Sequence, residues 1–267
     1  MKKTLMFNTI LSMVLLVFIT TASAGPVIER IVKNGKLVVG TSGAQPPLSA
    51  TDKNGEIIGM DADIAQLIAH NMGVKIEFKT MPFADLLPAL STGSVDLVIS
   101  GMTITPKRNM EVAFVGPYYI SGKGILTKKK HLDALQGAAG LNQAQFRVTA
   151  LKDSTSQRFV EKEAPKAKLI PATSYDQAIQ WLFDDNVDVL IADAPFCALT
   201  AFRFPEKGLT AGQDRLTFEP LGIAVKEDAL MINWLQNFML ALNGSGELKH
   251  LTQKWLQDGS WISQLPE

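Results

Sequence analysis

Residues 96–108 read DLVISGMTITPKR, and this stretch decides the fold that we predict. An apolar run is followed by small and hydroxyl-bearing residues, and then by a proline and two basic residues. We predict a buried strand over 95–100, a turn, and a short helix with Thr105 at its N-cap and Pro106 at its first position. Such a layout can hold an anion, because Arg108 offers a planar fork of donors that matches a carboxylate.

Strand and helix patterns alternate upstream of this stretch. Strand patterns occupy 36–41 and 74–78, with a helical pattern after Asp61 between them. A second helical pattern, over 83–90, leads into the strand at 95–100. The order strand–helix–strand–helix–strand predicts a parallel α/β unit with right-handed crossovers.

A second unit of the same plan follows downstream. Strand patterns occupy 146–151, 168–171 and 187–192. Helical patterns open at Ser154 and Ser174, which are good N-cap residues. The two units predict an α/β protein of two lobes, each with a mostly parallel sheet flanked by helices.

Two crossings between the lobes are expected, near 118–130 and over 218–225. The tail over 229–261 has helical spacing, breaks into two helices at 243–246, and packs most simply on the first unit. We therefore assign 25–121 and 222–267 to lobe 1, and 122–221 to lobe 2.

The first 24 residues have the pattern of a secretory signal peptide. Lys2 and Lys3 precede an apolar run, and Ala22-Ser23-Ala24 is a typical cleavage site. An uncleaved membrane anchor is the alternative, but the apolar run is short for a spanning helix of ~20 residues. We predict cleavage after Ala24 and export of the remainder.

The composition argues against several functions. The chain has 26 basic and 26 acidic residues, and without the two lysines of the leader its formal charge is −2. No basic patch indicates a nucleic-acid partner. Cys197 is the only cysteine and lies in an apolar run, which favours a core position over a nucleophile. The three histidines lack metal-ligand spacing, so we expect no metal and no cofactor.

Three loops follow the carboxyl ends of predicted strands, where open α/β sheets bind ligands. The first holds Thr103 and Arg108. The second holds Ser154 and Thr155 at a helix N-terminus, and the third holds Asp193. A cation, a helix N-terminus and a carboxylate together suit a zwitterion.

With these features the chain resembles the bacterial extracellular solute-binding proteins of the polar amino-acid family (family 3), the periplasmic components of ABC importers. The resemblance is carried by 59–64 (GMDADI), 87–90 (LPAL), 96–108, 116–119 (GPYY), 192–193, 222–225 (GIAV) and the final helix over 246–255. It implies a periplasmic-binding-protein type II fold whose two lobes, joined by two hinge strands, close on the ligand. It further implies a periplasmic monomer without catalytic activity, which delivers a small amino acid or related carboxylate to a membrane permease.

The resemblance also implies roles for individual residues. Arg108 would hold the α-carboxylate of the ligand, assisted by the N–H of Thr155 and the hydroxyl of Thr103. Asp193 would take the α-ammonium, together with the carbonyl of Ser100 or Gly101.

The side-chain pocket departs from the family pattern. Phe83 falls where the family often has an aromatic wall, but Ser42 and Gln45 stand where an acidic residue and an aromatic are common. Lysine, arginine and histidine are therefore disfavoured as ligands. Asp153 replaces a usual glycine, and it either caps the following helix or places negative charge close to the ligand carboxylate.

Alternatives stay open at this point. Arg108 as a surface ion-pair partner, Asp193 as an N-cap and Phe83 as a core residue are ordinary structural roles. Cyclohexadienyl (prephenate/arogenate) dehydratases share the scaffold, but no histidine or glutamate is obviously aimed at the site. A sensory input module would use the same binding chemistry with a signalling partner.

Overall fold

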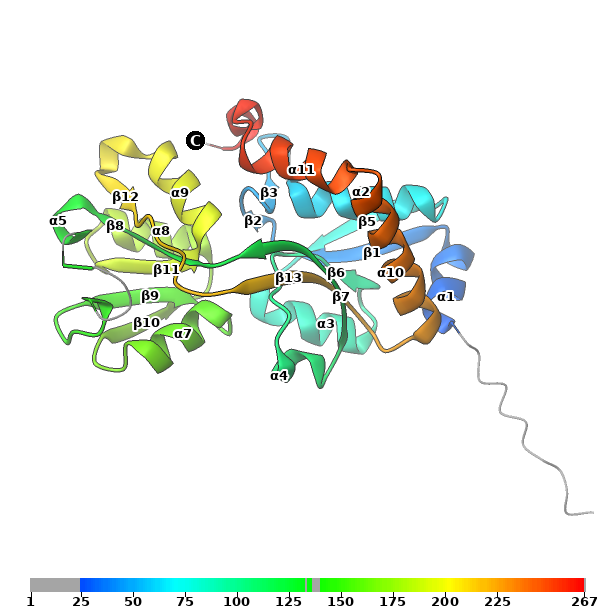
Figure 1. The fold of residues 1–267 in the computed structure, drawn as a ribbon, viewed down its shortest axis with the longest axis horizontal. Coiled ribbons are helices and arrows are strands. Elements are labelled where there is room, and N and C mark those ends of the chain that lie inside the picture. Colours follow the sequence, from blue (N-terminus) through cyan, green and yellow to red (C-terminus); the bar gives the residue numbers. More distant parts are fainter. Residues whose placement is uncertain (1–24, 133, 136–139, 267) are drawn as a thin grey trace, which may run out of the picture.

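The structure, a computed structural model, describes residues 25–132, 134–135 and 140–266. The predicted signal peptide, residues 1–24, lies outside the described residues. Figure 1 shows two lobes side by side, joined by long strands that run between them. These strands are β7 (Ala113–Ser121), β8 (Lys123–Lys128) and β13 (Glu219–Val225).

Lobe 1 is built on a five-stranded sheet of order β5-β1-β6-β13-β7. Its remaining strands are β1 (Lys36–Thr41), β5 (Lys75–Thr80) and β6 (Leu97–Val98). β1 runs parallel to both β5 and β6, as predicted, whereas β13 is antiparallel to β6 and β7. The helices of this part are α1 (Pro26–Asn34), α2 (Met60–Asn71), η1 (Phe83–Asp85), α3 (Leu86–Thr92) and α4 (Pro106–Asn109). A small sheet lies beside them, with β2 (Ala44–Gln45), β3 (Ser49–Thr51) and β4 (Ile57–Ile58).

Lobe 2 repeats this plan with the order β10-β9-β11-β8-β12. β9 (Arg147–Leu151) runs parallel to β10 (Lys168–Ala172) and β11 (Val189–Asp193), and β8 is antiparallel to β11 and β12 (Leu209–Ala211). The helices here are α5 (Lys129–Leu132), α7 (Thr155–Glu163), α8 (Tyr175–Phe183), α9 (Ala194–Arg203) and η2 (Pro205–Lys207). The predicted repeat of architecture is therefore present in both sheets.

The C-terminal segment packs on lobe 1, as predicted. It consists of α10 (Ala229–Gly244), α11 (Glu247–Leu256) and η3 (Ser260–Gln264). Met231 and Trp255 from these helices share one buried apolar cluster with Val39 of β1 and Ile64 of α2. Figure 1 shows α10 and α11 lying over this lobe. The tail thus returns the chain to the lobe in which it began.

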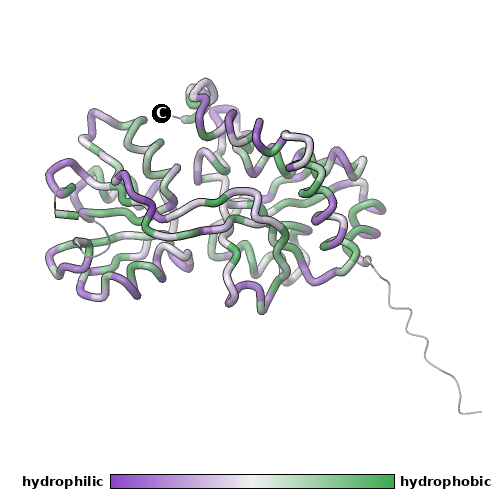
Figure 2. The backbone as a smooth tube through the Cα atoms, in the orientation of Figure 1, coloured by the Kyte–Doolittle hydropathy of each residue, from purple (hydrophilic) through white to green (hydrophobic). Residues whose placement is uncertain are grey.

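A second apolar cluster crosses between the lobes. Phe83 and Met102 of lobe 1 belong to the same buried cluster as Leu151 and Tyr175 of lobe 2. Figure 2 shows hydrophobic segments converging along the sheets and polar segments toward the periphery. The lobes are thus closed on one another, and apolar side chains line part of the junction.

Some elements differ from the pattern-based expectation. The strand expected over 95–100 is limited to Leu97–Val98 in β6, because the chain then turns at Gly101 with a positive φ of 56°. The expected crossing near 118–130 divides into β7 and β8. β13 begins at Glu219, which pairs with Ser121 at the junction, so the lobe limits at 121 and 222 remain a proposal.

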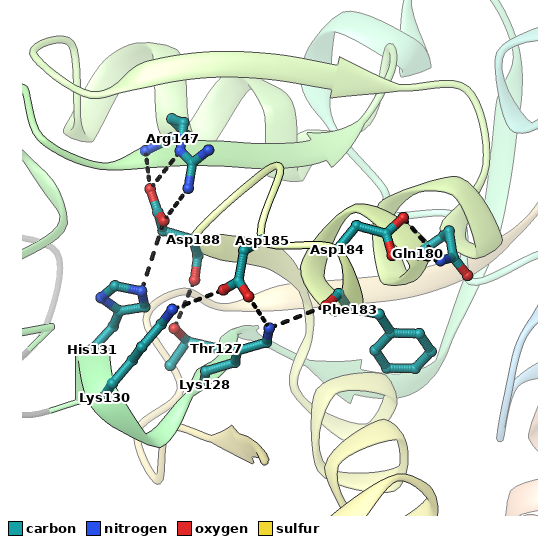
Figure 3. Close-up of polar contacts among 10 residues, drawn as sticks. All are labelled: Thr127, Lys128, Lys130, His131, Arg147, Gln180, Phe183, Asp184, Asp185 and Asp188. Carbon is teal, nitrogen blue, oxygen red and sulfur yellow. Dashed lines mark hydrogen bonds and ion pairs between the residues drawn. The ribbon is translucent and has the colours of Figure 1, made fainter. Parts of the chain in front are cut away.

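A cluster of ion pairs links several elements in the outer part of lobe 2 (Figure 3). Asp188 accepts hydrogen bonds from the backbone N–H and guanidinium of Arg147, at 2.7–3.1 Å. Asp185 pairs with Lys128 and Lys130 at 2.7 and 2.8 Å. Lys128 and Lys130 thus tie β8 and α5 to the loop before β11.

Candidate functional site

The loop after β6 has a shape that requires glycine at one position. Gly101 has φ 56°, and a Cβ there would lie 2.8 Å from the side-chain oxygen of Gln45. Its N–H donates to the Asp61 carboxylate at 2.7 Å. Thr105 caps α4 as predicted, its hydroxyl accepting from the N–H of Arg108 at 3.2 Å. These contacts fix the loop and hold the start of α4 in place.

Arg108 is buried, with an exposed fraction of 7%. Its Nη1 donates to the carbonyl of Thr103 at 2.9 Å, and its guanidinium lies over the Phe83 ring, 5.5 Å from the ring centre. Burial, with the nearby charge of Arg158, lowers the pKa of Arg108 to about 10, so it stays a cation at neutral pH. Within the described ranges no carboxylate lies at ion-pair distance from Arg108.

A cavity of about 250 Å³ adjoins this guanidinium and takes its lining from both lobes. We call it the arginine cavity; its lining includes Phe83, Met102, Arg108, Asp153 and Arg158. Arg158, on α7, has a buried Nη2 atom without a hydrogen-bond partner. It was not among the predicted site residues, although it lies three positions after Thr155 and therefore on the same face of the helix.

Ser154 and Asp153, which precede α7, have different structural roles. Ser154, not Asp153, caps the helix: its hydroxyl accepts from the N–H of Gln157 at 3.1 Å and donates to the Leu151 carbonyl at 2.5 Å. Asp153 is exposed and has φ 59°, in the left-handed region that favours glycine. Its N–H donates to the side chain of Gln157 at 2.8 Å. The glycine usual in the family would adopt this conformation without strain.

Two hydroxyls meet where the lobes face each other. Thr103 Oγ1 lies 3.3 Å from Thr155 Oγ1, so the first and second predicted loops are in contact. Thr103 is buried and forms an isolated bridge with Leu221 of β13. The structure therefore brings Arg108, Thr103 and Thr155 together around one region, as the sequence suggested.

The third loop holds a carboxylate that is already paired. Asp193 is 3% exposed. Its Oδ1 lies 2.9 Å from Nζ of Lys123, and its Oδ2 lies 2.5 Å from Nε2 of Gln45. Asp193 occupies the N-cap position of α9, yet its side chain makes no capping hydrogen bond. The carboxylate that the sequence placed in the third loop is thus one side of an ion pair.

Lys123 also faces Glu219, at 3.5 Å from Oε2. Burial raises the pKa of Glu219, but Lys123 and the hydroxyls of Thr103, Thr217 and Thr155 outweigh it and hold this pKa below the ordinary value. Lys123 and Glu219 lie at the lobe junction, in β8 and β13. Neither was predicted as a site residue, because neither follows the end of a strand in the two repeated units.

The remaining predicted residues line the other side of the junction. The N–H of Ser42 donates to the Ser100 hydroxyl at 2.9 Å, and the two hydroxyls are 3.1 Å apart. Ser42 and Phe83 also line a second cavity, which continues to Leu151 and Tyr175 of lobe 2. Phe83 is buried and borders both cavities, so the wall and core interpretations of this residue coexist.

The structure also bears on three other features: a reactive cysteine, a metal site and a membrane-spanning helix. Burial raises the pKa of the Cys197 thiol to about 12, which agrees with a core role for this cysteine. Within residues 25–132, 134–135 and 140–266, no cluster of three or more His, Cys, Asp or Glu side chains suits a metal ion. The same ranges contain no helix with the length and apolar character needed to cross a membrane.

The fold and the interlobe cavities define a two-lobed α/β solute-binding protein with the periplasmic-binding-protein type II topology. The chain belongs to the bacterial extracellular solute-binding proteins, family 3, whose family model matches residues 37–258.

Three comparisons illustrate this membership. The chain is 29% identical to the ABC transporter arginine-binding protein 1 of Escherichia coli (strain K12), over 82% of this chain and 90% of that protein. The crystal structure of an ancestral amino acid-binding protein, a precursor of cyclohexadienyl dehydratase, superposes with a TM-score of 0.80 at 33% identity, covering 86% of this chain and 99% of the other. The cyclohexadienyl dehydratase of Pseudomonas aeruginosa is 23% identical, over 86% of each chain. The scaffold therefore supports binding proteins and at least one enzyme.

Proposed function

We propose that this protein captures a small amino acid or related carboxylate between its two lobes and delivers it to the membrane permease of an ABC importer. The observation that carries the proposal is the buried guanidinium of Arg108, which borders an interlobe cavity without a carboxylate partner among the described residues. A buried cation without a partner is costly, and an anionic ligand would relieve that cost. Residues of both lobes line this cavity, so binding and closure are coupled.

We assign Arg108 to the ligand carboxylate, with the hydroxyls of Thr103 and Thr155 beside it. Phe83 and Ser42 border the space left for the rest of the ligand. The relatives named above include an arginine-binding protein and an ancestral amino acid-binding protein, which supports a solute with an amino-acid-like carboxylate. The proposal includes export to the periplasm, cleavage after Ala24 and a monomeric state.

Isothermal titration calorimetry of the chain from residue 25 onward, across the common amino acids and small carboxylates, tests the proposal. Arg108→Ala should weaken binding of the ligand so found by about 30-fold or more, because it removes a charge-assisted hydrogen-bond pair worth about 2–4 kcal/mol. Arg147→Ala is the matched control: it removes an arginine paired with Asp188 in outer lobe 2, so it should lower the melting temperature and leave affinity unchanged. Unchanged binding by folded Arg108→Ala would refute the assignment.

A dehydratase is the second candidate, favoured by the related enzyme on the same scaffold. Such catalysis needs a general acid that keeps its proton near neutral pH. Glu219 has a lowered pKa, and Asp193 is paired with Lys123, so neither suits this role. Burial raises the pKa of Asp61 to about 6, but this carboxylate accepts from the Gly101 N–H and lines neither interlobe cavity. We therefore propose a non-catalytic protein. Incubation with prephenate and arogenate, followed by detection of aromatic products, decides between the two.

A further inference from the structure

Lys123 is the largest fully buried charged side chain of the described structure, with an exposed fraction of 2%. It lies directly opposite Asp193 in the antiparallel pairing of β8 and β11. Its backbone N–H donates to the hydroxyl of Thr217 at 3.0 Å, and its Nζ lies between the carboxylates of Asp193 and Glu219, at 2.9 and 3.5 Å. An ammonium group of the protein itself is thus fixed beside these two acids.

We propose that Lys123 occupies the place of a ligand ammonium, so that this protein selects carboxylates that lack an α-ammonium group. The inference rests on the proposed function, because it presumes that a carboxylate binds at Arg108. The inference narrows the expected ligands: of the amino acids and related carboxylates, only carboxylates without an α-ammonium group remain.

The first argument is that each oxygen of Asp193 already accepts a hydrogen bond from a donor of the protein itself. Lys123 contacts Oδ1 and Gln45 contacts Oδ2. The carboxylate is almost fully buried, so a bound ammonium would compete with these two donors for the same oxygens. Displacing Lys123 would leave a buried charge without its partner, which is strongly unfavourable.

The second argument concerns the other acids near the junction. An ammonium bound to Oε2 of Glu219 would come close to Nζ of Lys123, which lies 3.5 Å from the same atom, and the two like charges would repel. Asp61 is 1% exposed and accepts from the Gly101 N–H, beneath the loop rather than in either cavity. The exposed Asp153 and Glu111 border the arginine cavity, where Arg108 and Arg158 lie.

The third argument is the balance of charge at the arginine cavity. Its lining holds three cations, Lys107, Arg108 and Arg158, and two acids, Glu111 and Asp153. Neither Arg108 nor Arg158 forms an ion pair with a described carboxylate. Lys123 compensates Asp193 and Glu219 nearby. A ligand with net negative charge fits this arrangement better than a zwitterion does.

Matched pairs of ligands test the inference on the unmodified protein. Each pair differs in the α-amino group alone: glutarate with L-glutamate, glutaramate with L-glutamine, and 5-guanidinopentanoate with L-arginine. For any pair that binds, calorimetry should give at least tenfold tighter binding of the member without the amino group, which is ~1.4 kcal/mol. Equal or tighter binding of the amino acid in every such pair would overturn the inference.

Lys123→Met supplies the second arm. It removes the internal ammonium and leaves room for that of a ligand, so the affinity ratio should shift at least tenfold toward the amino acid. Lys128→Met is the matched control, because Lys128 lies in the same strand and pairs with Asp185 away from the cavities. If Lys123→Met folds and the ratio stays unchanged, the inference fails. If it does not fold, the ligand pairs on the unmodified protein still decide.

Failure of the inference and failure of the proposed function are distinguishable. Amino acids that bind more tightly than their partners, with affinity lost in Arg108→Ala, would overturn the role of Lys123 and leave the proposed function standing. If Arg108→Ala binds carboxylates as tightly as the parent does, both the role of Lys123 and the proposed function are overturned.

Discussion

Gln45 of lobe 1 donates a hydrogen bond to Asp193 of lobe 2, with 2.5 Å between Nε2 and Oδ2. Gln45 is 2% exposed, so this contact is buried at the junction between the lobes. With the contact between Thr103 and Thr155, it gives the closed form polar links between the lobes that involve protein atoms alone. A protein of this kind reaches closure by combining such links with ligand contacts.

Gln45→Ala should shift the equilibrium toward the open form. The lost hydrogen bond is worth about 0.5–1.5 kcal/mol, so the affinity for ligand should fall about two- to tenfold. Small-angle X-ray scattering of the ligand-free protein should show a larger radius of gyration. Gln145→Ala, at an exposed position in lobe 2, is the control and should change neither quantity. A mutant as compact as the parent would show that Gln45 does not hold the lobes together.

Asp153→Gly should strengthen carboxylate binding. The substitution relieves a residue with φ 59° and removes a negative charge from the lining of the cavity that holds Arg108 and Arg158. The gain from an exposed charge is about 0.5–1 kcal/mol, or two- to fivefold in affinity. Asp153→Asn removes the charge and keeps a side chain, so it should give the affinity gain without the backbone effect. Weaker binding by both variants would mean that Asp153 contributes to ligand binding.

Asp188→Asn should destabilise the protein by about 1–3 kcal/mol, because Arg147 loses charge-assisted hydrogen bonds. Burial opposes the charged form, but Arg147 outweighs it and lowers the pKa of Asp188. This stabilisation is therefore present above the pKa of an unfolded aspartate and is lost as pH falls through the lower folded pKa.

Urea denaturation at neutral pH measures the effect of Asp188→Asn. Glu163→Gln, which removes an exposed ion pair with Lys162, is the control and should change the free energy of unfolding by less than about 0.5 kcal/mol. A loss at Asp188 no larger than the loss at Glu163 would contradict the structural role of the cluster in Figure 3.

Asp61→Asn should alter the pH dependence of stability. Burial raises the pKa of Asp61 to about 6, above the ordinary value of 3.8. The folded state therefore holds the proton more tightly, and the stability contributed by this group is complete below pH 3.8 and is lost as pH rises to about 6. The shift corresponds to roughly 3 kcal/mol. Asparagine does not titrate, so the mutant should gain stability relative to the parent between pH 4 and 7.

Denaturation of both proteins at several pH values gives this difference directly. Asp63→Asn, in the same helix but at a partly buried position that pairs with Lys254, is the comparison. This variant keeps the Asp61 carboxylate, so the pH dependence of stability that Asp61 contributes should remain in it. A pH-independent difference between the parent and Asp61→Asn would contradict the raised pKa.

Local chemistry made much of the fold predictable. The N-caps Thr105, Ser154 and Ser174 accept the hydrogen bonds expected of them, because such caps depend on residues three positions apart. Strand and helix periodicity likewise placed β1, α2 and β9 within a few residues. Helix α1 and the strands β2 to β4 were not predicted, since they are short and carry weak patterns.

The sequence by itself determined the family, the two-lobed plan and the loops that carry Arg108, Thr155 and Asp193. Only the tertiary structure decided what these side chains face. Lys123 meets Asp193 through the antiparallel register of β8 and β11, 70 residues apart in sequence, and Gln45 reaches the same carboxylate from the other lobe. Both contacts depend on how distant strands pair and how the lobes close. Periodicity and capping are local, so they carry no information about which buried charge a distant lysine will neutralise.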